Sequence, residues 1–139
     1  MGRKRIEKSF RLPRNEYMET LWYIRGYRRA LDDYEAILEA SSAPADGQPH
    51  GSGPSDPTFL KASRLAVVSA KIRPVEKALE RVPAEYRRGL LRAIIERERY
   101  PDYAHPNTWA LWRHRFVYWV AVEAGIHFED PPSTPENNG

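Results

Sequence analysis

Apolar residues recur every three or four positions along most of this chain, the spacing that is typical of amphipathic α-helices. The first repeat lies between residues 13 and 39, with charged residues on the opposite face, and consists of Tyr17, Ile24, Tyr27, Leu31, Tyr34 and Leu38. A long helix is therefore predicted over 13–39. It begins at Pro13, because proline is tolerated in a first helical turn.

A second helix is predicted from Pro57 to Val82. Its apolar positions are Leu65, Val68, Ile72, Val75, Leu79 and Val82. Asp56 is placed to cap the free amides at the start. Because the repeat stays in phase across Pro74, one kinked helix is favoured over two separate helices, with a break at Arg73 as the alternative.

Residues 41–55 separate these two helices and are rich in glycine, proline and small polar residues, so they predict a flexible loop. Two long helices on either side of such a loop can bury their apolar stripes against each other. Residues 13–82 are therefore expected to form a long antiparallel helical hairpin of coiled-coil type.

Two further helices are predicted over about 83–99 and from Asn107 or Thr108 to Gly125. Gly125 is a typical left-handed helix terminator, and the hydrophobic Ile126 follows it. A turn of seven residues, 101–107, separates the two helices, and no strand pattern appears. The predicted fold class is all-α, in which the hairpin precedes a compact C-terminal helix pair over 83–126.

The last helix carries a stripe of Trp109, Trp112, Phe116, Trp119 and Glu123. Bulky rings at this spacing are expected to form the core of the C-terminal unit. Arg113, His114 and Arg115 lie off that stripe, near the N-terminal half of the helix, and are expected to project elsewhere.

The composition fits one compact domain with tails: 139 residues, of which 41% are hydrophobic and none is cysteine. The absence of thiols suits a reducing compartment. No apolar run approaches the roughly 20 residues that cross a membrane, and no secretory signal follows the basic N-terminus. A cytoplasmic protein without a membrane partner is predicted.

The net charge of +3 is unevenly distributed. Residues 1–30 contain nine basic and three acidic side chains, a local balance of +6, and residues 1–12 form a basic arm that includes Arg3, Lys4 and Arg5. Residues 127–139 form an acidic tail that is expected to be disordered. A basic arm attracts phosphate backbones, although a solvated tail explains the charge equally well.

No catalytic motif is present. The four histidines, His50, His105, His114 and His127, lack metal-ligand spacing, and no phosphate-binding loop or nucleophile elbow occurs. The acidic residues of 83–99 lie among arginines and indicate surface ion pairs. The chain is expected not to be an enzyme, and no metal or cofactor is expected.

Five short segments follow one another between residues 55 and 126: Ser55–Thr58, Val75–Leu79, Val82–Arg87, the Tyr100–Pro101 turn and Thr108–Ile126. The order of these motifs resembles the phage transcriptional regulators of the RinA/ArpU type. Those regulators are similar to the promoter-reading region of sigma factors. The resemblance implies a DNA-binding regulator of late phage genes, with the last helix as the reading element.

The residues expected to contact double-stranded DNA of a phage promoter are Arg3, Lys4, Arg5, Asn107, Thr108, Arg113, His114 and Arg115. The chain departs from a sigma-like helix-turn-helix because seven residues with two prolines cannot hold a middle helix. Either the helix over 83–99 is the supporting element, or DNA binding is lost. The alternative function is a helical interaction module that docks on RNA polymerase, on a phage protein or on a second copy of the chain.

Overall fold

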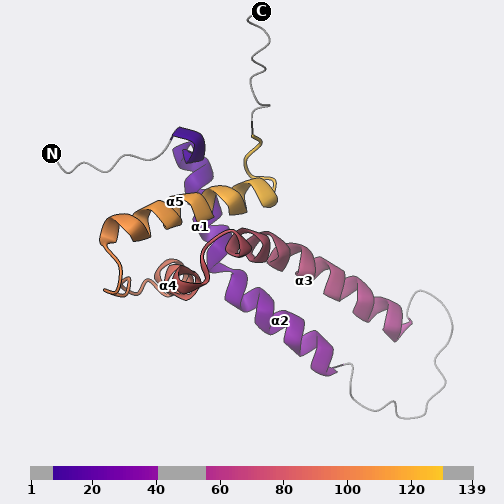
Figure 1. Ribbon diagram of the computed structural model, residues 1–139. Coiled ribbons are helices and arrows are strands. Elements are labelled where there is room, and N and C mark those ends of the chain that lie inside the picture. The colour runs from indigo at the N-terminus through magenta and orange to yellow at the C-terminus, as the bar shows by residue number, and fades with distance from the viewer. Residues whose placement is uncertain (1–7, 41–55, 130–139) are drawn as a thin grey trace, which may run out of the picture.

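The computed structural model describes residues 8–40 and 56–129, and both ranges are helical without a strand (Figure 1). A 3-10 turn, η1 (Lys8–Phe10), precedes five helices: α1 (Arg14–Arg25), α2 (Tyr27–Ala40), α3 (Pro57–Glu80), α4 (Ala84–Ile95) and α5 (Pro106–Glu123). The predicted all-α class is confirmed. The predictions of a flexible loop at 41–55 and of disorder over most of 127–139 lie outside the described residues.

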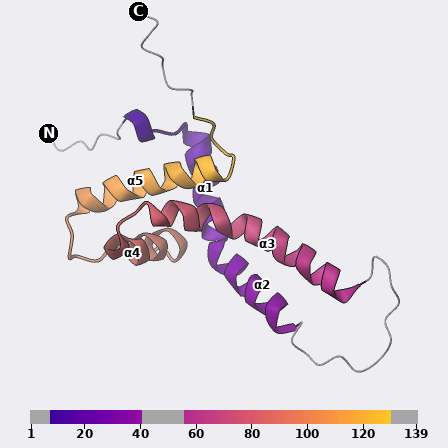
Figure 2. The ribbon, with the colours of Figure 1, turned by 45° about the vertical axis from the view of Figure 1, so that its right-hand side comes forward.

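The helix predicted over 13–39 is divided at Gly26. The Gly26 N–H bonds the Tyr23 carbonyl at 3.1 Å, a tight three-residue turn, and the regular pattern resumes where Ala30 N–H bonds Gly26 O at 3.0 Å. Glycine is a poor helix former, so this is a weak point in the repeat. As a result, α2 leaves α1 in a new direction (Figures 1 and 2).

The prediction of one helix that continues across Pro74 is confirmed by α3, which ends at Glu80 rather than at Val82, and the alternative break at Arg73 is wrong. The Asp56 side chain accepts a hydrogen bond from Thr58 N–H at 3.0 Å, and Pro57 occupies the first helical turn, as expected. Pro74 lies inside the helix and is buried. Burial removes its apolar ring from water, which helps to offset the hydrogen bond that proline removes.

The third helix is shorter than predicted, because α4 ends at Ile95 rather than near Arg99. Arg97 adopts a left-handed backbone conformation with φ 57°, and the Glu98 N–H then returns to the Arg92 carbonyl at 3.3 Å. A residue in the left-handed conformation ends an α-helix, but an arginine in the sequence does not predict that conformation. The apolar repeat therefore overestimated the length of this helix.

The last helix begins earlier than predicted. His105, rather than Asn107 or Thr108, is the N-cap of α5, and its Nδ1 accepts a hydrogen bond from Asn107 N–H at 3.0 Å. The predicted terminator is confirmed: Gly125 has φ 76°, and Ile126 N–H bonds the Ala121 carbonyl at 2.8 Å. This is the hydrogen-bond pattern of a left-handed helix cap, which glycine adopts without a steric penalty.

Helix α5 lies across α1 and the C-terminal part of α3, and α4 packs against α1 and α5 (Figures 1 and 2). The buried side chains of α4 and α5 belong to the same cluster as those of α1 and α3. The most deeply buried members are Ile24, Val75, Val82, Leu90, Ile94, Trp109, Phe116, Val117 and Val120. Helices from both halves of the chain therefore contribute to one core.

Helices α2 and α3 lie side by side and run in opposite directions (Figure 1). Two tyrosines link the N-terminal end of α2 and the adjoining end of α1 to α3. The Tyr23 hydroxyl donates to the Lys71 carbonyl at 2.8 Å, and the Tyr27 hydroxyl donates to Glu76 Oε2 at 3.3 Å. Away from this end, towards Ala40 and Pro57, the pair has no buried residue.

Trp109 is the centre of the C-terminal packing. Its ring stacks on Tyr100 with centroids 5.0 Å apart, and the edge of the Tyr86 ring contacts it at 5.1 Å. Its Nε1 donates to the Pro101 carbonyl at 3.0 Å. Trp112, expected on the same buried stripe, is only half-buried and stacks on Tyr86 at 6.1 Å.

The close approach of α5 to α4 depends on Gly89. A Cβ at this buried position would lie 2.5 Å from Cη2 and 2.8 Å from Cζ3 of Trp109, and 3.2 Å from Cδ of Pro101. No real Cβ occupies such a place without displacing its neighbours. The Trp109 ring therefore uses the space that a side chain at position 89 would fill.

Replacing Gly89 with alanine should lower the free energy of unfolding by about 1–3 kcal/mol, because overpacking outweighs the gain in helix propensity. Gly26→Ala is the matched control, since its Cβ would meet nothing closer than the Tyr23 carbonyl at 3.6 Å. That variant should be neutral or more stable by up to about 1 kcal/mol. Urea unfolding of both proteins measures the difference, and equal stabilities would contradict the tight Gly89–Trp109 contact.

The Tyr27–Glu76 contact should make stability sensitive to alkaline pH. Burial of the Tyr27 phenol, then the Glu76 charge and its hydrogen bond, raise the pKa from 10.0 to about 12. The unfolded chain therefore loses this proton first, so the contribution to stability is complete below pH 10 and is lost between pH 10 and about 12. Tyr27→Phe should lose less stability over that interval in unfolding measurements; an identical alkaline decline would contradict the assignment.

Candidate nucleic-acid interface

Arg113, expected to project away from the core, is instead half-buried between α1, α5 and the turn after α4. Its Nε donates to the Tyr17 hydroxyl and its Nη1 to the Tyr100 hydroxyl, both at 3.0 Å. Burial disfavours its charged form, but the two hydrogen bonds more than offset this and raise its pKa above the ordinary value. Arg113 therefore holds the protein's own elements together.

The next two predicted residues also contact aromatic rings of the protein. His114 lies against the Tyr17 ring with centroids 5.9 Å apart. The Arg115 guanidinium lies 5.1 Å from the ring centroids of both Phe10 and Trp112, within the range of cation–π attraction. These contacts attach η1 and α1 to the outer side of α5.

Of the other predicted residues, Asn107 is exposed in the first turn of α5 and Thr108 is half-buried beside it. Arg3, Lys4 and Arg5 lie outside the described residues. The structure thus places the predicted α5 residues along one helix, and Asn107 is the exposed one among them, whereas the others are half-buried. DNA reading by this helix stays a prediction.

A different basic surface is formed by α2 and α4. Arg28, Arg87, Arg88 and Arg92 line an open groove of about 430 Å³, together with Leu91 and Glu96. The lining thus contains four arginines and one acidic residue. Arginines around the third predicted helix were noticed in the sequence, but this groove was not predicted, because Arg28 is about sixty residues away from the others.

The arginine groove has one wall on α4 and one on α2, and local structure explains the position of each arginine. Arg88, Arg92 and Glu96 are spaced by four residues, so they share one face at the end of α4. The division at Gly26 directs α2 past that face and brings Arg28 to it. Arg87 Nε donates to the Val82 carbonyl at 2.8 Å, so the Arg87 guanidinium is held just beyond the C-terminal end of α3, where a positive charge is favourable.

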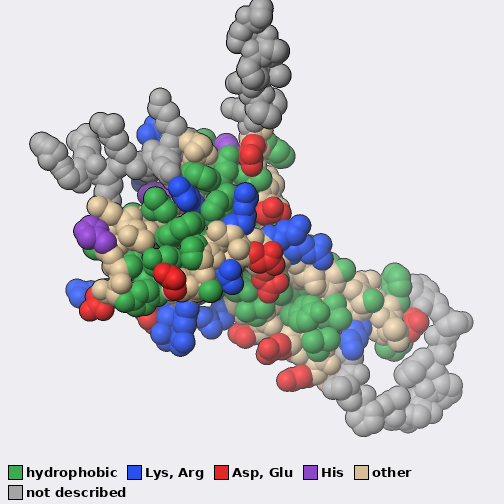
Figure 3. Space-filling model, in the orientation of Figure 1, with side chains coloured by type: hydrophobic (Ala, Val, Ile, Leu, Met, Phe, Trp, Pro, Cys, Tyr) green, Lys and Arg blue, Asp and Glu red, His purple; other side chains and the backbone are tan. Residues whose placement is uncertain are grey.

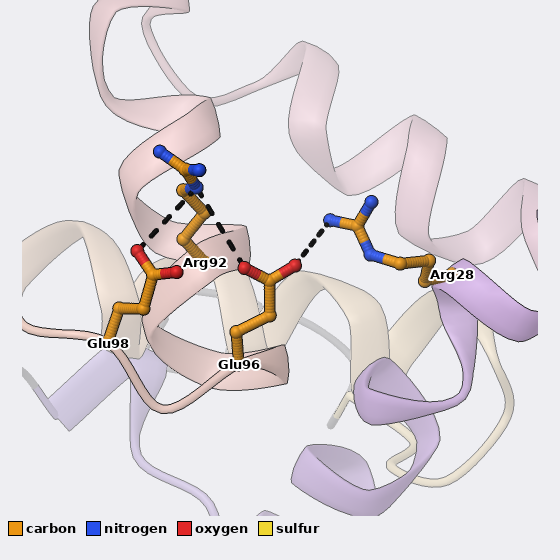
Figure 4. Close-up of polar contacts among 4 residues, drawn as sticks. All are labelled: Arg28, Arg92, Glu96 and Glu98. Carbon is orange, nitrogen blue, oxygen red and sulfur yellow. Dashed lines mark ion pairs between the residues drawn. The ribbon is translucent and has the colours of Figure 1, made fainter.

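One carboxylate joins the two walls (Figure 4). Glu96 Oε2 lies 3.0 Å from Arg28 Nη2, whereas Glu96 Oε1 and Glu98 Oε1 lie 3.9 and 3.6 Å from Arg92 Nε. The longer distances indicate loose pairing of Arg92. Because all four side chains are partly exposed, these ion pairs stabilise the fold little and can exchange with other anions.

The positive charge extends behind the groove to Arg25 in α1. Its Nε donates to the Ile94 carbonyl at 3.0 Å, at the end of α4. Burial lowers the pKa of Arg25, and the positive charges of Arg97 and Arg113 lower it further. Arg25, Arg97 and Arg113 therefore lie close enough for their positive charges to repel one another. In Figure 3, Lys and Arg side chains gather beside α4.

Within residues 8–40 and 56–129 the structure shows neither a metal-binding cluster nor a membrane-spanning helix. These ranges contain no group of three or more His, Asp or Glu side chains that could hold a metal ion. None of their helices is both long enough and apolar enough to cross a membrane. The arginine groove is taken as the candidate nucleic-acid site because four arginines line it together with one carboxylate.

Arg113→Met should destabilise the protein by about 1–3 kcal/mol, because two tyrosine hydroxyls lose a charged donor. The matched control is Arg88→Met, which removes the same charge from an exposed position and should leave the unfolding midpoint unchanged. Thermal and urea unfolding measure both. If the two variants were equally stable, Arg113 would not have the structural role assigned to it.

The chain matches no known protein family, no curated protein and no solved structure. The resemblance to regulators of the RinA/ArpU type therefore rests on the order of sequence motifs alone.

Proposed function

We propose that this protein binds double-stranded DNA through the arginine groove and serves as a phage-type regulator of late-gene transcription. The observation that carries the binding proposal is the convergence of Arg28, Arg87, Arg88 and Arg92 on one groove with a single carboxylate. The regulatory part of the proposal rests on the motif order over residues 55–126.

Guanidinium groups suit this ligand because their planar fork matches phosphate oxygens in a bidentate way. Each phosphate that is neutralised also releases condensed counterions from the duplex, which favours binding at low salt. Arg87 is held by backbone carbonyls, so little side-chain freedom is lost when it contacts an anion. The loosely paired Arg92 can exchange a carboxylate for a phosphate oxygen at low cost.

Contacts of this type position a protein on DNA but carry no sequence information. Sequence reading would require a further element, and the exposed Asn107 in the first turn of α5 is the described α5 residue best placed for base contact. Arg113 and Arg115 contact the protein's own side chains, so they contribute less to this proposal than they did on sequence grounds. We therefore expect the groove to account for most of the affinity.

The direct test is fluorescence anisotropy with duplex DNA at several salt concentrations. For contacts with two to four phosphates, the plot of log affinity against log salt should have a slope of about −2 to −4. Arg88→Gln should make the slope shallower by about 1, and adding Arg92→Gln by about 1 more. The weakening should be similar on unrelated duplexes.

Arg73→Gln is the matched control, because Arg73 is an exposed arginine of α3 outside the groove. It should keep the wild-type salt slope. Absence of binding at low salt would refute DNA binding altogether. Binding that is equally sensitive to Arg73→Gln and Arg88→Gln would place the contact elsewhere on the protein.

A further inference from the structure

The outer ends of α2 and α3 form an exposed helical arm within the described residues. This distal arm, residues 31–40 and 57–71, contains no buried residue, although apolar side chains recur along both helices. Phe59, Leu60 and Val67 are 61%, 40% and 60% exposed. Beyond Ala30 and Ile72, where burial stops, the two helices have only each other to pack against among the described residues.

A groove of about 470 Å³ runs between the two helices of the distal arm. Its apolar lining includes Ala36, Leu60 and Val67, and the charged residues Asp33 and Arg64 also line it. Figure 3 shows hydrophobic side chains gathered between α2 and α3, with acidic side chains along α2. Surfaces that combine exposed apolar groups with a polar border are typical of protein interaction sites.

We propose that a second copy of this chain occupies the groove, so that two distal arms form an antiparallel four-helix bundle. One pair of helices buries a single stripe on each helix, whereas two pairs enclose a core between them. The arm projects away from α4 and α5 (Figures 1 and 2). This inference goes beyond DNA binding and does not depend on it.

Charge complementarity favours a copy of the chain over an unrelated partner. Within the arm, α2 carries Asp32, Asp33, Glu35 and Glu39 and no basic residue. Over the same arm α3 carries Lys61, Arg64 and Lys71 and no acidic residue. A two-fold axis along the groove would place the acidic α2 of each copy beside the basic α3 of the other. Every favourable contact then occurs twice.

The first test is the molar mass of the full-length protein between about 1 and 100 µM, by sedimentation equilibrium in the absence of DNA. We expect the mass to rise from 16.1 kDa towards twice that value. Val67→Asp should weaken association at least tenfold, because it puts a charge into the apolar lining. Ala66→Asp adds the same charge to the neighbouring exposed position outside the lining and should associate like the wild type.

The second test asks whether the contact joins two copies of the chain. Asp33→Lys and Arg64→Asp each place like charges opposite one another in a homodimer, so each variant alone should be mainly monomeric. When the two variants are mixed in equal amounts, a mixed dimer places the introduced lysine of one copy opposite the introduced aspartate of the other. Positions 33 and 64 within each chain still carry like charges, so only the contact between copies is restored. The mixture should therefore dimerise more strongly than either variant.

A wild-type protein that stays at 16.1 kDa up to about 100 µM would overturn the proposal. The occupant of the groove would then be another partner or residues 41–55. A dimer that Val67→Asp does not weaken would place the interface elsewhere. If mixing the two charge variants does not strengthen association, the proposed α2–α3 pairing between copies is wrong.

Discussion

The contact between Trp109 and Gly89 is the constraint on which the C-terminal half of this protein depends. The indole occupies the space that a Cβ at position 89 would fill, and Tyr86, Tyr100 and the Pro101 carbonyl enclose its other sides. Helix α5 can therefore approach α4 closely while its opposite end packs on α1 and α3. Because the same core contains Ile24, Val75 and Val117, a disturbance at position 89 reaches helices far apart in the sequence.

The aromatic packing also decides which cations remain available to a ligand. Arg113 bonds two tyrosine hydroxyls, and Arg115 lies against two rings, so the arginines of α5 are used largely within the protein. The arginines of α4, together with Arg28, instead line a groove whose one carboxylate pairs closely with Arg28 and loosely with Arg92. Four arginines therefore gather beside α4, where a ligand can reach them.

The distal arm differs physically from this region. Burial ends at Ala30 and Ile72, and beyond them apolar side chains border a groove with acidic residues on one helix and basic residues on the other. The two proposed surfaces use different residues and different interactions. Phosphate binding in the arginine groove weakens with salt and needs no second copy, whereas association through the arm needs a second copy and combines apolar burial with charge pairing. Measurements of salt dependence and of molar mass can therefore separate them.

Periodicity and local capping signals were enough to predict the all-α class, the uninterrupted α3, the Asp56 cap and the Gly125 terminator, because each depends on residues close together in sequence. They could not predict the division at Gly26, the His105 cap or the early end of α4 before Arg97, where small backbone preferences are decided by packing. The candidate site was harder to predict from the sequence than these helix ends. The arginines on α4 were visible in the sequence, but only the tertiary structure brings Arg28 to them and turns Arg113 inward, since contacts between distant segments leave no periodic trace in the chain.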